Sequence, residues 1–160
     1  MKKTKCVVAA VLMAAMTVGS AAAYQVEDKS FLTMYQSGGD ERISSNGDFD
    51  FNVHVAVNGN LFSVKGNTAS LSVNAESYDS RGEYCTDTAE YSVSILTDTL
   101  GLTKLKVNTI TGVRGSGSTT TLNPDEKYYL RVSAATTVTT GSGPYYVAGS
   151  GHVSNVKAVY

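Results

Sequence analysis

Tryptophan is absent from this chain of 160 residues, and proline and cysteine occur only twice each. Charged residues make up 17% of the sequence, and the formal net charge is −1. A nucleic-acid-binding domain is normally basic and carries clusters of Lys and Arg, which this chain lacks after residue 5. The composition therefore argues against nucleic acid and other polyanions as partners, and the length suits a single domain.

The first 23 residues have the three parts of a secretory signal peptide. Three lysines precede an apolar run that ends near Val18, and residues 21–23 are the small side chains that the peptidase requires. The run is about 13 residues long, below the roughly 17–25 residues of a spanning helix. We therefore expect cleavage before Tyr24, a secreted or cell-surface protein without a membrane span, and a formal charge that falls from −1 to −4 with the three lysines.

Cleavage would remove Cys6 and leave Cys85 as the only thiol of the mature chain. A single cysteine in an exported protein is either inert, reactive or a link between two chains. Glu83 and Asp87 lie close to Cys85 in the sequence and disfavour its thiolate. We therefore expect an inert thiol, with self-association through Cys85 as the alternative.

After residue 24 the apolar residues recur with the period of two that is typical of strands. In the segment 49–57, for example, the odd positions are apolar and the even ones are mostly polar. Asn58-Gly59 follows and favours a two-residue hairpin turn, so we expect Val57 to pair with Asn60. Residues 112–118 contain three glycines and are predicted to form a turn.

Further strands are predicted at 60–65, 69–75, 90–97, 102–110, 128–138 and 145–155. Seven or eight strands without helices between them imply antiparallel pairing. The predicted fold is therefore an all-β, two-sheet antiparallel sandwich over residues 48–160, with a barrel as the alternative. Residues 24–47 are expected to add an N-terminal edge segment and a loop to this one domain.

The segment 122–134 resembles the E–F corner of fibronectin type III domains. Its Leu, Pro, Tyr, Leu, Val and Ala residues recur at even offsets, and Pro124 and Tyr128 occupy the positions of the turn proline and the corner tyrosine. The resemblance implies an immunoglobulin-like order of strands and a Tyr128 hydroxyl that bonds back to the preceding loop. The chain is also similar to small β-sandwich modules of secreted bacterial proteins, and the resemblance implies a binding or adhesion role by analogy.

No phosphate-binding glycine motif is present, and His54 and His152 are the only histidines. Both are predicted on the polar face of a strand, where they could meet Asp50 and either Ser63 or Ser150 if their strands were neighbours. Exposed histidines without such a role are far commoner, and two histidines do not make a zinc site. We therefore expect no enzyme activity and keep a His-dependent hydrolase as an alternative.

Four acidic residues flank the Gly-, Ser- and Asn-rich segment 37–47, and calcium prefers such oxygen donors. The candidate calcium ligands are Asp40, Glu41, Asp48 and Asp50. The spacing matches no standard calcium loop, so the alternative is a solvated loop and no cofactor.

Tyrosine is frequent, with 10 copies against four of phenylalanine. By strand phase, one ring of each adjacent pair points outward: Tyr129 beside Arg131, and Tyr146 beside His152. Exposed aromatic rings with polar neighbours suit sugars or partner proteins. These four residues are the candidate ligand-binding residues of a secreted, non-enzymatic module that binds a glycan, a wall component or another protein. The alternative is a structural protein that assembles through an edge strand.

Overall fold

The computed structural model describes residues 42–135 and 143–160. The predicted signal peptide, most of the segment 24–47 and the candidate ligands Asp40 and Glu41 lie outside the described residues. The strands are β1 (Asp48–Val53), β2 (Ala56–Val64), β3 (Ala69–Tyr78), β4 (Tyr84–Cys85), β5 (Glu90–Thr97), β6 (Thr103–Ile110), β7 (Gly115–Thr119), β8 (Tyr128–Ala135), β9 (Tyr146–Val153) and β10 (Val156–Val159). The described part of the chain contains no helix long and apolar enough to cross a membrane.

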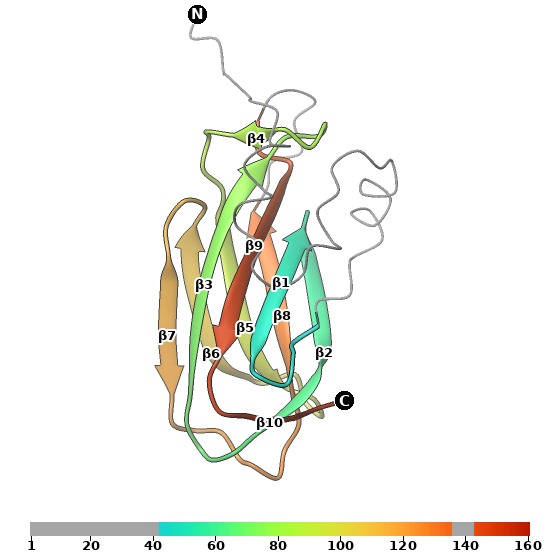
Figure 1. Cartoon of the computed structure of the whole chain (residues 1–160), viewed down its shortest axis with the longest axis vertical. Coiled ribbons are helices and arrows are strands. Elements are labelled where there is room, and N and C mark those ends of the chain that lie inside the picture. The colour runs from blue at the N-terminus through green and yellow to red at the C-terminus, as the bar shows by residue number, and fades with distance from the viewer. Residues whose placement is uncertain (1–41, 136–142) are drawn as a thin grey trace, which may run out of the picture.

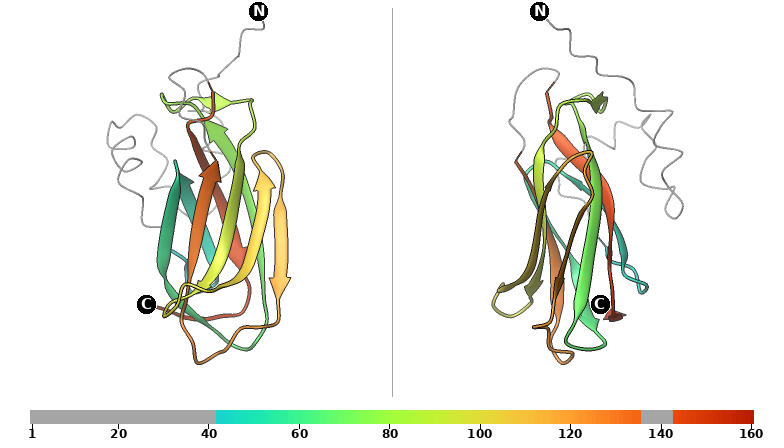
Figure 2. Two further views of the ribbon diagram at one scale, coloured as in Figure 1. Left: turned by 180° about the vertical axis from the view of Figure 1, so that it is seen from behind. Right: turned by 90° about the vertical axis from the view of Figure 1, so that its left-hand side faces the viewer.

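Two antiparallel sheets pack face to face, as the edge-on view in Figure 2 shows. Sheet A has the order β1-β9-β3, and β3 then pairs with β7 along its first half and with β4 at its end. Sheet B has the order β10-β2-β8-β5-β6. In Figure 1, β1, β9, β3 and β7 form the front layer and the strands of sheet B lie behind them. The predicted all-β, two-sheet antiparallel sandwich is thus confirmed.

The order of the strands is that of a jelly roll, in which almost every connection crosses from one sheet to the other. The immunoglobulin-like order that the resemblance implied is not the observed one. In immunoglobulin domains the first two strands are neighbours in one sheet, whereas β1 and β2 belong to different sheets here. The local corner is nevertheless formed: the Tyr128 hydroxyl accepts a hydrogen bond from the Asn123 N–H at 2.7 Å. This tyrosine corner depends only on six adjacent residues, so its presence does not indicate the order of the strands.

The predicted Asn58-Gly59 hairpin is wrong. The chain turns at residues 54–55 instead, where it leaves sheet A for sheet B, and Asn58-Gly59 lies inside β2. Asn58 pairs with Arg131 and Leu61 with Tyr129, so the register of β2 against β8 shifts at Gly59 and Asn60, which form a bulge in place of a turn. The predicted turn at 112–118 is also partly wrong, because Gly115–Thr119 pairs with β3 as β7.

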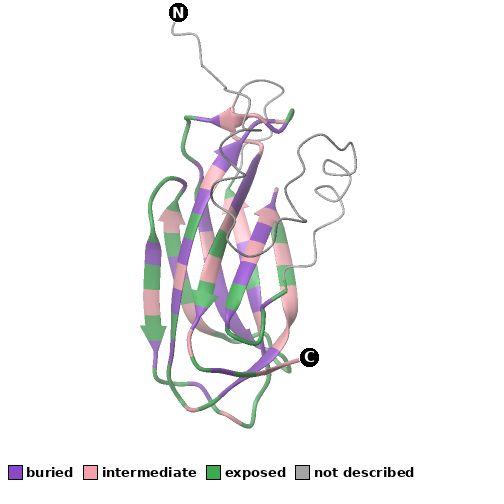
Figure 3. Ribbon diagram, viewed as in Figure 1, coloured by how far each residue is buried: buried purple, intermediate pink, exposed green. Residues whose placement is uncertain are grey.

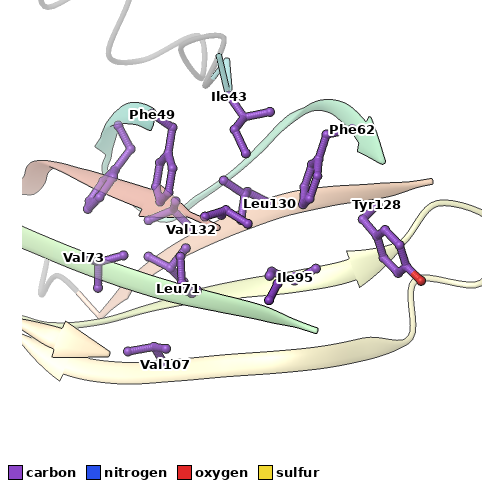
Figure 4. Close-up of a cluster of buried hydrophobic side chains, with 14 of the residues drawn as sticks. Ile43, Phe49, Phe62, Leu71, Val73, Ile95, Val107, Tyr128, Leu130 and Val132 are labelled. Atoms are coloured by element: carbon purple, nitrogen blue, oxygen red, sulfur yellow. The ribbon is translucent and has the colours of Figure 1, made fainter. Parts of the chain in front are cut away.

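The core lies between the sheets and consists of the apolar side chains that alternate along the strands (Figures 3 and 4). Phe49 and Phe51 of β1 face Gly151 and Gly149 of β9 across the ladder. A Cβ atom at Gly151 would lie 2.3 Å from the Phe49 ring, so glycine is required for this packing. Gly151 therefore makes room for the Phe49 ring and Gly149 for the close approach of β3, and their outward neighbours Ser150 and His152 keep a fixed register.

Candidate functional site

The outer face of sheet A is a continuous polar surface. Along β1, β3 and β9, the residues between the core positions point outward, as the strand period requires. The ladders place them in rows, because β9 pairs with both β1 and β3. Two adjacent rows run Asp48–His152–Ser72 and Asp50–Ser150–Asn74. Side chains that are far apart in the sequence thus meet on one face.

An open hollow of about 500 Å³ lies on this face, between β9, β3 and the β6–β7 loop. We call it the sheet A hollow. Its lining residues are Ser72, Val73, Asn74, Gly112, Arg114, Ser150, Gly151 and His152. Within residues 42–135 and 143–160, the side chains of Ser72, Asn74, Arg114 and Ser150 make no hydrogen bond or ion pair. They offer both donors and acceptors to a ligand.

The β6–β7 loop that carries Arg114 is fixed against β3. The Gly112 N–H donates to the Ala75 carbonyl at 2.8 Å, and Gly112 has a φ of 78°, which favours glycine. The Val113 N–H bonds the Ile110 carbonyl, and the Val113 carbonyl accepts from the Thr109 hydroxyl at 3.2 Å. Arg114 therefore projects from a defined backbone position at the edge of the hollow.

His152 is held by Asp48, whose Oδ1 lies 2.8 Å from the His152 Nδ1. The other Asp48 carboxylate oxygen accepts from the Asn46 side chain at 2.7 Å. Both side chains are about half exposed, 48% for His152 and 62% for Asp48. The bond leaves the His152 Nε2 to face the solvent or a ligand.

The hydrolase alternative predicted that the strands of His54 and His152 might bring them together with Asp50 and a serine. The structure brings His152, Asp50 and Ser150 to one face but places Ser63 in sheet B, nearly buried. His54 lies beyond the end of β1 and stacks on Tyr145, with ring centroids 4.2 Å apart. Among the described residues no serine hydroxyl is hydrogen-bonded to His152, so the hydrogen-bonded nucleophile that such a mechanism uses is missing from this arrangement.

Two of the four candidate calcium ligands, Asp48 and Asp50, lie among the described residues. Asp48 and Asp50 point to the same outer face of β1, and both Asp48 oxygens already have partners. Within residues 42–135 and 143–160 no three His, Cys, Asp or Glu residues are grouped to hold a metal ion.

Tyr146 is not on the surface. Its strand phase is as predicted, since it points away from the main core, but it is fully buried at the end of sheet A. It stacks on Tyr78, with centroids 5.1 Å apart, and a Cβ atom at Gly82 would lie 3.5 Å from its hydroxyl. The 79–83 loop that covers it is held by Asp79, which is fully buried and accepts the N–H groups of Arg81 and Glu83. Local alternation along the strand does not reveal a loop that folds back over it.

Two partly exposed tyrosines, Tyr84 and Tyr145, lie near this end of sheet A. The ring of Tyr84 meets Tyr78 edge-on at 6.3 Å. Burial raises the pKa of the neighbouring Glu76 carboxyl, and a hydrogen bond with Tyr84 opposes that shift. Aromatic side chains and the polar hollow thus share the outer side of sheet A.

Tyr129 and Arg131 lie on the opposite side of the molecule, on the outer face of sheet B. The four predicted ligand-binding residues therefore do not form one site. A second hollow of about 520 Å³ lies on sheet B. Its lining is mixed: it contains polar residues such as Asn108 and Ser133, but it exposes more apolar surface than the sheet A hollow, with Ile110, Ala134 and Ala135. We call it the sheet B hollow.

Sequence reasoning missed Asn74 and Arg114. Asn74 occupies a polar position of a predicted strand, so its outward direction was available from the alternation. Arg114 is a single cation between Gly112 and Gly115, and only the docking of the β6–β7 loop on β3 brings it to Asn74. Cys85 is 2% exposed, so a disulfide between two chains would require the end of β3 and β4 to open.

No protein-family model matches the sequence, and no curated protein sequence matches it. Three solved structures are similar in part. A family GH115 4-O-methyl-α-glucuronidase with specificity for decorated arabinogalactans has a TM-score of 0.38 and 6% identity, over 69% of this chain and 14% of that chain. The module TmCBM61, solved with β-1,4-galactotriose, has a TM-score of 0.32 and 10% identity, over 69% of this chain and 66% of that chain. The carbohydrate-binding module CBM36, solved with calcium and xylotriose, has a TM-score of 0.28 and 12% identity, over 72% of this chain and 80% of that chain.

The chain thus spans 14% of the length of the glucuronidase and 66% of TmCBM61. All three TM-scores lie below 0.5, so the fold is defined by the strand order described above and not by these matches.

Proposed function

We propose that this protein is an exported, non-catalytic binding module and that the sheet A hollow binds an extracellular glycan. The observation that carries the proposal is a set of side chains that have no partner among the described residues and line one hollow from three elements: Ser72, Asn74, Arg114 and Ser150. A sugar presents hydroxyl groups that both donate and accept, and hydroxyl, amide and guanidinium groups match that chemistry.

The size and surroundings of the hollow support a sugar ligand. Its volume of about 500 Å³ falls within the range of roughly 300–1,000 Å³ of small-molecule sites. The strands β9 and β3 that line it are paired on both sides, so the backbone positions of their polar residues are fixed before binding and the cost of ordering is limited to the side chains. Tyr84 and Tyr145 could extend the surface along the sheet, because sugar rings pack well on aromatic faces.

A thermal-melt screen tests the proposal. The purified protein is heated with wall polysaccharides, neutral and acidic oligosaccharides, Ca²⁺ or EDTA. A ligand at about 100 times its dissociation constant adds roughly 2.7 kcal/mol to the free energy of unfolding, which raises the melting temperature by several degrees. We expect a rise with at least one sugar class, and no rise with any of them would contradict the glycan proposal.

Matched variants then locate the binding. Asn74→Ala/Ser150→Ala truncates two polar side chains of the sheet A hollow, and Asn108→Ala/Ser133→Ala truncates the same residue types in the sheet B hollow. We expect the first pair of substitutions to abolish the shift and the second to leave it intact. If only the second pair abolished the shift, glycan binding would be assigned to the sheet B hollow.

The sheet B surface is a second candidate because Tyr129, Arg131 and a hollow that exposes more apolar surface than the sheet A hollow share that face. Such a surface suits a protein partner better than a hydroxyl-rich sugar. Loss of capture of a cell-surface protein by Tyr129→Ala, with the same melting temperature, would support this function.

Two further proposals, a calcium site and self-association, have tests of their own. A stabilising shift with Ca²⁺ that EDTA reverses would support the calcium site at Asp40, Glu41, Asp48 and Asp50. Self-association through an edge strand predicts a sedimentation coefficient that rises with protein concentration, and a monomer at all concentrations would contradict it.

A further inference from the structure

Arg114 is a positive charge at one edge of the sheet A hollow, next to β7. Its side chain is exposed and makes no ion pair within the described ranges 42–135 and 143–160. The turn that carries it is anchored to β3 through the bond between Gly112 and the Ala75 carbonyl. The guanidinium is therefore presented from a fixed backbone position, and no acidic side chain of the described residues pairs with it.

Two acidic residues of this face, Asp48 and Asp50, lie at the opposite edge, whereas Glu76 lies in β3 outside the lining of the hollow and is hydrogen-bonded to Tyr84. Asp50 is in β1, and β9 and β3 separate it from the β7 edge. Three strand spacings amount to about 14 Å, which exceeds the Debye length of about 8 Å at physiological ionic strength. Asp48 is on the same far strand and is bonded to His152 and Asn46. Arg114 thus carries a permanent positive charge in the lining of the hollow, and the acidic residues of β1 lie at the far end.

We infer that Arg114 makes the sheet A hollow selective for a glycan that carries a carboxylate, that is, for a uronic acid unit. The inference rests on the proposed function and names the ligand class of that site. The guanidinium fork matches a planar carboxylate with two parallel hydrogen bonds, which a hydroxymethyl group cannot reproduce. Asn74 and Ser150, next to Arg114 in the lining, would bind the ring hydroxyls of the same sugar unit.

The ligand class follows from the placement of one charge and not from the overall charge of the protein. The formal net charge expected after signal cleavage is −4, so the molecule as a whole does not attract a densely charged polyanion. A glycan with isolated carboxylates needs only the local field at Arg114. This distinguishes a uronic acid unit in a largely neutral chain from a fully charged polymer.

The test uses pairs of probes that differ in one group. The probes are the methyl glycosides of glucuronic, galacturonic and mannuronic acid, each with its neutral parent sugar. Dissociation constants are measured by ligand-observed NMR at 150 mM NaCl, a concentration that screens weak surface attraction. A charge-assisted hydrogen bond contributes enough to predict that one uronate binds about tenfold more tightly than its parent.

Four variants test which residue causes the preference for the uronate. Arg114→Gln is expected to bring the uronate to within about twofold of its parent, because only the charged contact is lost. Asn74→Ala is expected to weaken acid and parent by the same factor. Lys157→Gln, which removes an equally exposed charge from β10 of sheet B, is expected to keep the preference. Arg114→Lys, with one charge but no fork, is expected to keep part of it.

The outcomes separate the inference from the proposed function. Equal binding of acid and parent sugars, both sensitive to Asn74→Ala, would overturn the inference and leave the glycan site standing. Loss of the preference in Lys157→Gln as well would also overturn it, since general electrostatics would then be the cause. If sulfated methyl glycosides bound in preference to all three uronates, Arg114 would recognise a different anion, and the inference of a uronic acid would be overturned. Failure of every sugar in the melt screen would overturn both.

Discussion

Replacing Gly149 by alanine tests the packing that fixes the register of β9. Gly149 faces Phe51 of β1 on one side and Ala75 of β3 on the other. An added Cβ would lie 2.2 Å from the Asn74 carbonyl oxygen and 2.5 Å from the Ala75 Cβ. These atoms belong to the backbone or are attached directly to it, so no side-chain rotation can relieve the overlap. The strands must separate or bend.

The expected cost has two opposing parts. Overpacking of a tight site destabilises a protein by about 1–3 kcal/mol. Alanine also restricts the unfolded chain, which by itself would stabilise the fold by about 0.4–1 kcal/mol. We therefore expect Gly149→Ala to lower the free energy of unfolding by about 1–2 kcal/mol, against the sign of the usual glycine-to-alanine effect in a strand.

Urea unfolding of the variant and of Gly66→Ala gives the measurement and its control. Gly66 lies in the turn after β2, where an added Cβ meets no atom within 4 Å, so this control is expected to be neutral or stabilising. The midpoint should fall for Gly149→Ala with an unchanged slope, because the surface exposed on unfolding is the same. A Gly149→Ala protein as stable as Gly66→Ala would refute the close approach of β9 to β3 that the structure shows.

Three further predictions concern buried side chains. Tyr128→Phe removes the acceptor of the Asn123 N–H and should destabilise by about 1 kcal/mol, visible as a fall of about 4 °C in the melting temperature; an unchanged value would contradict the corner. Burial first, and then the nearby Glu76 charge, raises the pKa of Tyr78 and of Tyr91 to about 12. Both pKa values lie above the ordinary 10 because the folded protein favours the neutral phenols. The stability that these two neutral side chains contribute is therefore complete below pH 10 and is lost as the pH rises towards 12. Tyrosine absorbance at 295 nm should show a late ionising fraction whose titration coincides with unfolding, and complete ionisation of a still folded protein near pH 10 would contradict the burial. The Cys85 thiol is 2% exposed and should react with a thiol reagent only after denaturant is added, whereas fast reaction of the native protein would contradict its position.

The individual strands were predictable because their signal is local. Phe49, Phe51 and Val53 alternate with polar residues and are buried, as the strand period requires. The corner at Tyr128 was predictable for the same reason, since its partners lie within five residues. The Asn58-Gly59 hairpin failed because the connection between β1 and β2 is set by the exchange of sheets at residues 54–55, a tertiary effect that overrides the turn preference.

The order of the strands was not predictable from alternation, which says which side of a strand is buried but not which strand is its neighbour. β9 fits between β1 and β3 because Gly151 accommodates the Phe49 ring and Gly149 allows the close approach of Ala75, and the sequence showed those glycines only as a weakness of the strand. The candidate site was limited in the same way. His152 was predicted, but its partner Asp48 lies 104 residues away, and Asn74 and Arg114 meet only through the β6–β7 loop.

A titration followed by amide NMR spectra tests the central claim most directly, with the oligosaccharide that gives the largest shift in the melt screen. The account predicts that the amides with the largest changes lie in β3, β9 and the β6–β7 loop, around Asn74, Arg114 and Ser150. The outer residues of sheet B, including Tyr129 and Arg131, should change little. Changes centred on sheet B, with none around Asn74 and Ser150, would contradict the sheet A hollow as the glycan-binding site.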